Sequence, residues 1–178
     1  MVKRFNSNRK MKSESFSSSD VRRRRKLKES TNPEILQMFE DFGFYSDNDG
    51  TERYFFDDMP SMFRAVYYSD NQGVYIDWDV WGNSYEVYGQ DVSTVSKADS
   101  FLSKLYNWCE YNESDLIKLG LKALGFREDS PWEYSGKNQF DENVKVDLYN
   151  MTVYYEPEDE TYEIWGEDGL AKSGILEM

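Results

Sequence analysis

The spacing of apolar residues along the chain predicts short helices that alternate with strands. Asn32 is suited to cap a helix and Pro33 to occupy its first turn, and apolar residues continue from there at helical spacing. Gly43 supplies a C-terminal stop before Phe44, so we expect a helix over residues 33–42. Strands are expected near residues 53–57, 62–68, 74–81 and 85–89.

The clearest strand pattern is the alternation in VYIDWDVW at residues 74–81. One set of side chains is apolar and is predicted to face a core: Val74, Ile76, Trp78 and Val80. The set between them is predicted to face outward: Tyr75, Asp77, Asp79 and Trp81. This segment therefore predicts a strand with an acidic and aromatic outer face.

Two more helices are expected in the middle of the chain. Residues 96–111 have apolar side chains at the i, i+3, i+4 and i+7 positions of an amphipathic helix. Cys109 lies on this apolar stripe, where we interpret it as a small core side chain and not as a reactive thiol. The next helix is predicted to run from Ser114 to Leu124 and to stop at Gly125.

Two pairs of similar segments indicate an internal repeat. FGF at 42–44 matches LGF at 124–126, and YEVYGQD at 85–91 matches YEIWGED at 162–168. We therefore predict an α+β fold of two similar α-β-β-β modules, each with a small antiparallel sheet, joined by the amphipathic helix. The predicted segments are a disordered basic arm (1–32), a first module (33–91), a connecting helix (92–112) and a second module (113–178). The repeat suits either a structural duplication or a doubled binding surface.

The charges are divided unequally along the chain. The net charge is −13, yet residues 1–32 hold eleven cations and three acids and carry +8, whereas the remainder carries −21. The arm is rich in serine and poor in aromatic residues, so we expect it to be disordered in the free protein. Its densest cationic run is the predicted nucleic-acid contact: Arg22, Arg23, Arg24, Arg25, Lys26 and Lys28. The alternatives are a tail that folds back on the acidic body and a tail that only increases solubility.

The acidic residues gather at outward strand positions and in turns. Two residues along a strand separate carboxylates by about 6.8 Å, close to the axial rise of two phosphates on one DNA strand, so such a surface can imitate a phosphate backbone. Neighbouring aromatic side chains would add contact area at a protein interface. The predicted partner-binding residues are Asp77, Asp79, Trp81, Glu86, Glu156, Glu158, Asp159, Glu160, Glu163 and Trp165. The alternative is that these charges only keep the protein soluble.

The composition excludes several classes of catalytic site. The chain has no histidine and one cysteine, which excludes Ser-His-Asp and Cys-His catalysis, histidine metal sites and an internal disulfide. The acidic turn after Asp47 lacks the spacing of an EF-hand, and no glycine-rich nucleotide motif occurs. We therefore expect no catalytic residues, no metal site and no cofactor, and the sequence favours a binding protein over an enzyme. The enzymatic alternative is a magnesium-dependent nuclease that uses residues such as Asp57, Asp58 and Asp77.

The apolar runs of the chain are short. None approaches the roughly 20 residues that cross a bilayer, and no charged-then-apolar leader is apparent. We expect no membrane contact and a cytoplasmic location.

The chain as a whole resembles small proteins of phages and other mobile elements of Gram-positive bacteria. The likeness rests on the serine- and arginine-rich start, the acidic, tyrosine-rich α+β body and short strands such as YEVYG at 85–89, and it extends over the whole chain. Within that group the chain is similar to the anti-CRISPR proteins that inhibit Cas9. This resemblance implies an acidic surface that occupies the DNA groove of Cas9 and a basic arm that contacts guide RNA. It includes no family-specific motif, so it assigns no individual residue.

We therefore expect an inhibitor of a bacterial defence protein that processes nucleic acid. It would bind Cas9, or Cas9 with its guide RNA, in the host cytoplasm and block the binding or cleavage of target DNA. The alternatives are a metal-dependent nuclease that cleaves guide RNA, a nucleic-acid-binding phage regulator, and an acidic DNA mimic that blocks restriction enzymes or repressors. A homodimer is also compatible with the sequence.

Overall fold

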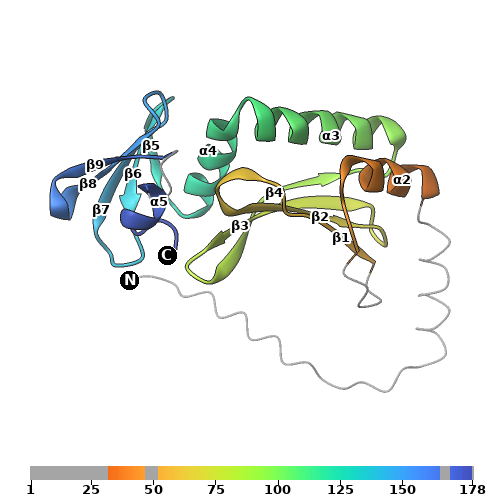
Figure 1. Ribbon diagram of the computed structural model, residues 1–178, viewed down its shortest axis with the longest axis horizontal. Coiled ribbons are helices and arrows are strands. Elements are labelled where there is room, and N and C mark those ends of the chain that lie inside the picture. The colour runs from red at the N-terminus through yellow and green to blue at the C-terminus, as the bar shows by residue number, and fades with distance from the viewer. Residues whose placement is uncertain (1–31, 47–51, 165–168, 178) are drawn as a thin grey trace, which may run out of the picture. The chain divides into compact units, whose positions relative to one another are not determined.

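The computed structural model describes residues 32–46, 52–164 and 169–177 (Figure 1). The predicted basic arm, with its contact at residues 22–28, and Trp165 lie outside the described residues. In chain order the elements are α2 (Pro33–Phe42), β1 (Arg53–Phe56), η1 (Pro60–Met62), β2 (Phe63–Tyr68), β3 (Gly73–Val80), β4 (Asn83–Asp91), α3 (Val95–Glu110), α4 (Glu113–Ala123), β5 (Arg127–Ser130), β6 (Glu133–Lys137), β7 (Asn143–Asp147), β8 (Thr152–Tyr155), η2 (Glu156–Glu158), β9 (Glu160–Glu163) and α5 (Gly169–Lys172). None of the helices in these described ranges has the length and apolar character of a membrane span.

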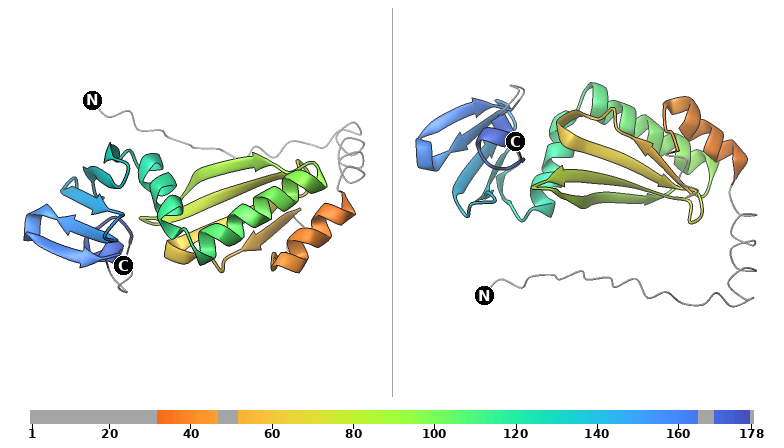
Figure 2. Two further views of the ribbon diagram at one scale, coloured as in Figure 1. Left: turned by 90° about the horizontal axis from the view of Figure 1, so that it is seen from above. Right: turned by 60° about the horizontal axis from the view of Figure 1, so that its bottom comes forward.

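The first sheet is four-stranded and antiparallel, in the order β1-β2-β3-β4. β3 shows the predicted alternation, because Val74, Ile76 and Trp78 are fully buried. α2 and α3 lie on this buried face (Figure 2), where the Phe39 ring of α2 stacks on Tyr67 of β2 with 4.2 Å between ring centroids. The helices therefore cover one face of the sheet, and the alternate strand positions form its outward face.

α2 begins and ends at the predicted residues. The Asn32 side chain accepts a hydrogen bond from the backbone N–H of the first turn at 3.0 Å, and Gly43 ends the helix with φ of 119°. The Phe44 N–H then returns to a carbonyl of the last turn at 3.0 Å, as in a Schellman cap. Gly125 and Phe126 repeat this arrangement after α4. FGF at 42–44 and LGF at 124–126 therefore match because each ends a helix with the same type of cap.

α3 and α4 both contribute to the core beneath the first sheet. α3 buries its predicted apolar stripe: Ala98, Phe101, Leu102, Leu105 and Trp108. α4 packs directly on the first sheet, although the sequence repeat predicts that it belongs to the second module. A Cβ at Gly120 would lie 2.0 Å from Cε3 of Trp78, so the helix backbone rests on the indole ring.

The second sheet is five-stranded and antiparallel, in the order β5-β6-β7-β8-β9. Its core-facing side chains include Tyr134, Val144, Val146 and Val153. The α+β class with two small antiparallel sheets is therefore confirmed, and the four strands expected between residues 53 and 89 form the first sheet. Both sheets have more strands than the α-β-β-β pattern of a module, with four in the first and five in the second. β5 has the sequence REDS, which carries no apolar pattern that would predict a strand.

The C-terminal segment connects the two sheets. The Trp81 Nε1 donates a hydrogen bond to the Gly174 carbonyl at 2.9 Å, and the buried Asn138 donates from Nδ2 to the Ser173 carbonyl at 2.9 Å. Ile175 is fully buried. Buried side chains from both sheets belong to one hydrophobic cluster, so the described body has a shared core.

Candidate partner-binding surface

Three of the predicted acidic residues stand together on the outward face of the first sheet. β3 places Asp77 and Asp79 on this face, and Glu86 of β4 pairs directly opposite Asp77. Ser84 pairs opposite Asp79 and donates its hydroxyl hydrogen bond to that carboxylate. We call Asp77, Asp79 and Glu86 the acidic patch. The register of the sheet brings Glu86 of β4 next to the two carboxylates of β3, which the sequence pattern does not show.

The acidic patch is held at an electrostatic cost. Burial raises the pKa of Asp77 above its ordinary value, and the negative charges of Glu86 and Asp79 raise it further. Arg64 of β2 pairs opposite Asp77 and opposes this shift, but its Nε also forms an ion pair with Asp57. Like charges directly opposite each other destabilise a sheet. The stability of the fold therefore does not explain why the patch is acidic.

Two tyrosine rings lie beside the acidic patch on the outward face. Tyr75 lies over Gly89, where an added Cβ would be 3.0 Å from the ring's Cδ1. Tyr68 packs edge-on against Tyr75 with 5.5 Å between ring centroids. Val66 pairs opposite Tyr75 on this outward face and is nevertheless only 3 % exposed. The face is thus a packed surface of rings and carboxylates.

The second acidic group forms the turn between β8 and β9. We call Glu156, Glu158, Asp159 and Glu160 the acidic turn. The Tyr154 hydroxyl donates to Asp159 at 2.8 Å. The Tyr162 hydroxyl lies 2.7 Å from a carboxylate oxygen of Glu158 and 2.8 Å from one of Glu160. These hydrogen bonds raise the pKa of both tyrosines, so the phenols stay protonated and hold the carboxylates in place.

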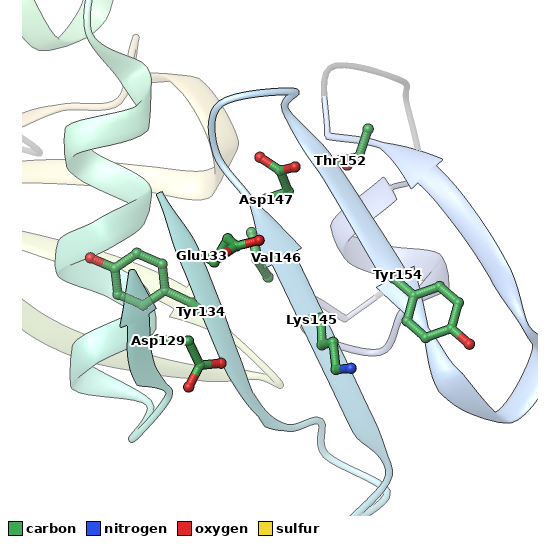
Figure 3. Close-up of a pocket in the computed structure, with 8 residues that line it drawn as sticks. All are labelled: Asp129, Glu133, Tyr134, Lys145, Val146, Asp147, Thr152 and Tyr154. Carbon is green, nitrogen blue, oxygen red and sulfur yellow. The ribbon is translucent and has the colours of Figure 1, made fainter. Parts of the chain in front are cut away.

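Glu163 lies apart from the acidic turn, at the other end of β9. It pairs opposite Thr152 in a cross-strand row that continues to Asp147 and Glu133. Glu133 and Asp147 border a shallow hollow of about 250 Å³, shown in Figure 3. Backbone N–H groups of the turn after β7 bond to Asp147 and lower its pKa. Glu133 and Asp147 extend the acidic surface. The sequence could have predicted the outward position of Asp147, because VKVD at 144–147 alternates apolar and charged residues.

Trp81 does not lie on the outward face, so the prediction that its side chain faces outward with Asp77 and Asp79 is wrong. β3 ends at Val80, and Trp81 stands in the following turn with φ of 54°. Its side chain packs against the core, and its Nε1 donates to the Gly174 carbonyl. Because the alternation stops at the turn, the position that would continue it is rotated toward the C-terminal segment. Trp81 therefore joins the end of β3 to the C-terminal segment.

The carboxylates in the described part of the chain are not arranged as a metal site. Among residues 32–46, 52–164 and 169–177, no three Asp, Glu, Cys or His side chains are placed to hold one ion. Asp57, a residue of the nuclease alternative, instead pairs with Arg64.

Burial and the nearby negative charge of Asp58 raise the pKa of Cys109 to about 11, so this thiol stays protonated at neutral pH.

Comparison of the chain with protein-family models, with curated proteins and with solved structures gave no match. A function is therefore inferred from the acidic patch and the acidic turn.

Proposed function

We propose that this protein is a non-enzymatic inhibitor that binds a basic, nucleic-acid-processing protein through its acidic patch. The observation that carries the proposal is the opposed pair Asp77 and Glu86, with Asp79 beside them. Like charges in this arrangement destabilise a sheet, and burial of Asp77 adds to the cost. A surface arrangement that lowers the stability of the fold is expected to serve a function.

The charge of the whole body supports a basic partner. Outside residues 1–32 the chain has 31 acids and ten bases. Such an excess creates a negative field that accelerates encounter with a positive surface and disfavours acidic partners. The acidic turn would add a second contact of the same sign. Because exposed charges are screened over about 10 Å at 0.1 M salt, binding is expected to weaken as salt increases.

Cas9 with its guide RNA is the first partner to test. Cas9 holds guide and target in a positively charged channel, which is complementary to the acidic patch. The arm at residues 22–28 is proposed to contact RNA phosphates of the same complex, which would give two-site binding. The resemblance in composition to anti-CRISPR proteins supports this choice of partner, and a bacterial cytoplasmic location belongs to the same proposal.

The test compares two triple variants of the full chain in a Cas9 target-DNA cleavage assay. The first neutralises the acidic patch without changing its shape: D77N/D79N/E86Q. The control removes the same charge from exposed positions on α2 and α3: E40Q/D99N/E110Q. We expect the control to inhibit cleavage like the wild type and the patch variant to lose about tenfold or more in potency.

The readouts separate the competing explanations. Neutralisation relieves repulsion, so the patch variant is expected to be at least as stable as the wild type, and its loss of inhibition would not reflect unfolding. Equal inhibition by both variants would remove the acidic patch from the proposal. The guide RNA from each reaction is run on a denaturing gel. An intact guide agrees with blockade, whereas a shortened guide that requires a divalent cation favours the nuclease alternative. Absence of inhibition by the wild type would exclude Cas9 as the partner.

A further inference from the structure

A pocket on the outward face of the second sheet is lined by cationic side chains, although the body as a whole is acidic. It has a volume of about 290 Å³. Its polar lining consists of Arg127, Ser135, Lys137, Asn143, Lys145 and Glu156. Three of the ten cations that follow the arm therefore meet at one place.

The register of the sheet places these cations around one hydroxyl group. Arg127 of β5 pairs opposite Ser135 of β6, which pairs opposite Lys145 of β7. Lys137 follows Ser135 by two positions and shares its face. The Arg127 Nη2 already donates to the Ser135 hydroxyl at 3.4 Å. Neighbouring strands are about 4.8 Å apart, so the three cationic positions lie within about 10 Å of one another and their long side chains can converge on one anion.

Within the described residues the two lysines of this pocket form no ion pair. The Lys137 Nζ donates to the backbone carbonyl of Asp141 at 2.9 Å. Arg127 pairs with Asp129 of its own strand at 2.7 Å. Glu156 is the one carboxylate in the pocket lining, so three cations and one acid line it, opposite to the balance of the body as a whole. The adjoining hollow, which Lys145 and Tyr154 also line, contains Asp129, Glu133 and Asp147.

An aromatic ring continues the same row beside the pocket. Lys145 pairs opposite Tyr154 of β8, and Figure 3 shows both side chains on neighbouring strands. The Tyr154 hydroxyl is held by Asp159, which restricts the orientation of the ring. A cationic groove beside a ring is the arrangement by which proteins hold single-stranded nucleic acid, with phosphates on the cations and a base on the ring.

We infer that this pocket binds the phosphate backbone of a short single-stranded nucleic-acid segment, with one base stacked on Tyr154. The acidic row that contains Glu133 and Asp147 borders the pocket and would repel a longer strand, so the contact covers only a few nucleotides. The inference depends on the second sheet alone and is independent of the proposed protein partner.

The test measures binding of the full chain to a labelled short uridine RNA over a range of salt concentrations. Lys137→Gln with Lys145→Gln removes two pocket cations. The matched control, Lys97→Gln with Lys122→Gln, removes two lysines that form ion pairs elsewhere. The basic arm is the same in all three proteins, so differences between them report the pocket. Each lost phosphate contact lowers the slope of log affinity against log salt by about 0.7 for a single strand, so we expect a loss of about 1.4 for the pocket variant and none for the control.

Equal slopes and affinities for the pocket variant and the control would overturn the inference. A second titration distinguishes a strand from a small phosphate, because inorganic phosphate and uridine monophosphate are followed through the amide resonances of Ser135 and Lys145. We expect both to bind at least about tenfold more weakly than the RNA, since they lack either the base or the neighbouring phosphates. Equal affinity for inorganic phosphate and RNA would contradict the assignment to a strand.

Discussion

Asp77 combines partial burial, an opposed carboxylate and a neighbouring carboxylate in one outward strand position. Its raised pKa means that the folded protein holds this proton more tightly than the unfolded chain does. The stability contributed by this group is therefore fully present below the ordinary value of 3.8 and is lost as the pH rises through the raised pKa. At neutral pH the ionised side chain opposes folding.

Replacement of Asp77 by Asn is expected to raise the free energy of unfolding at neutral pH by up to about 1 kcal/mol, because it removes the like-charge contact with Glu86. It should also remove the gain in stability that the wild type obtains from this group on acidification. Urea unfolding of both proteins near pH 7 and near pH 5 measures the two effects. Asp99→Asn, at an exposed position on α3, is the control and should match the wild type. A destabilised Asp77→Asn protein at neutral pH would contradict this account.

At the scale of elements, α4 and the first sheet are held together by the close approach of a helix backbone to an indole ring. Gly120→Ala would be stabilising by about 1 kcal/mol if helix propensity decided the outcome. Because the added Cβ would lie 2.0 Å from Trp78, we expect instead a loss of about 3 kcal/mol or more from overpacking. Thermal and urea unfolding measure the sign, with Ser103→Ala on the exposed side of α3 as control. A stabilised Gly120→Ala protein would show that α4 does not rest on this ring.

The acidic turn is a second element whose order depends on side-chain hydrogen bonds. Tyr162→Phe removes the hydroxyl that Glu158 and Glu160 share, so repulsion between these carboxylates is no longer offset. We expect faster amide hydrogen exchange over residues 156–160 and a change of at most about 1 kcal/mol in global stability. Tyr149→Phe, at a residue that is 77 % exposed, should leave the exchange unchanged. Equal exchange in both variants would mean that the backbone alone orders the turn.

At the scale of the whole molecule, the shared core and the bond from Trp81 to Gly174 predict that both sheets unfold together. Far-UV circular dichroism and tryptophan fluorescence are therefore expected to report one coincident transition. Trp81→Phe removes the indole donor and should lower the free energy of unfolding by about 1–2 kcal/mol while shifting both signals equally. Two separate transitions in the wild type would show that the sheets are independent units.

Local patterns in the sequence predict local structure well in this protein. The alternation of β3 and the caps of α2 depend on neighbouring residues, so they can be read from the chain. The support of α4 by Trp78 and the turn that redirects Trp81 depend on contacts between distant segments, which no local pattern contains. The same holds for the acidic patch, since its residues were predicted individually but their direct opposition follows from the sheet register.

Binding through the acidic patch is best measured as the equilibrium affinity of the wild type and the two triple variants for the Cas9–guide RNA complex, at low and at physiological salt. We expect D77N/D79N/E86Q to bind about tenfold or more weakly than the wild type and with a smaller salt dependence, and E40Q/D99N/E110Q to bind like the wild type. Equal affinity of the two variants, or no binding by the wild type at either salt concentration, would contradict the proposed function.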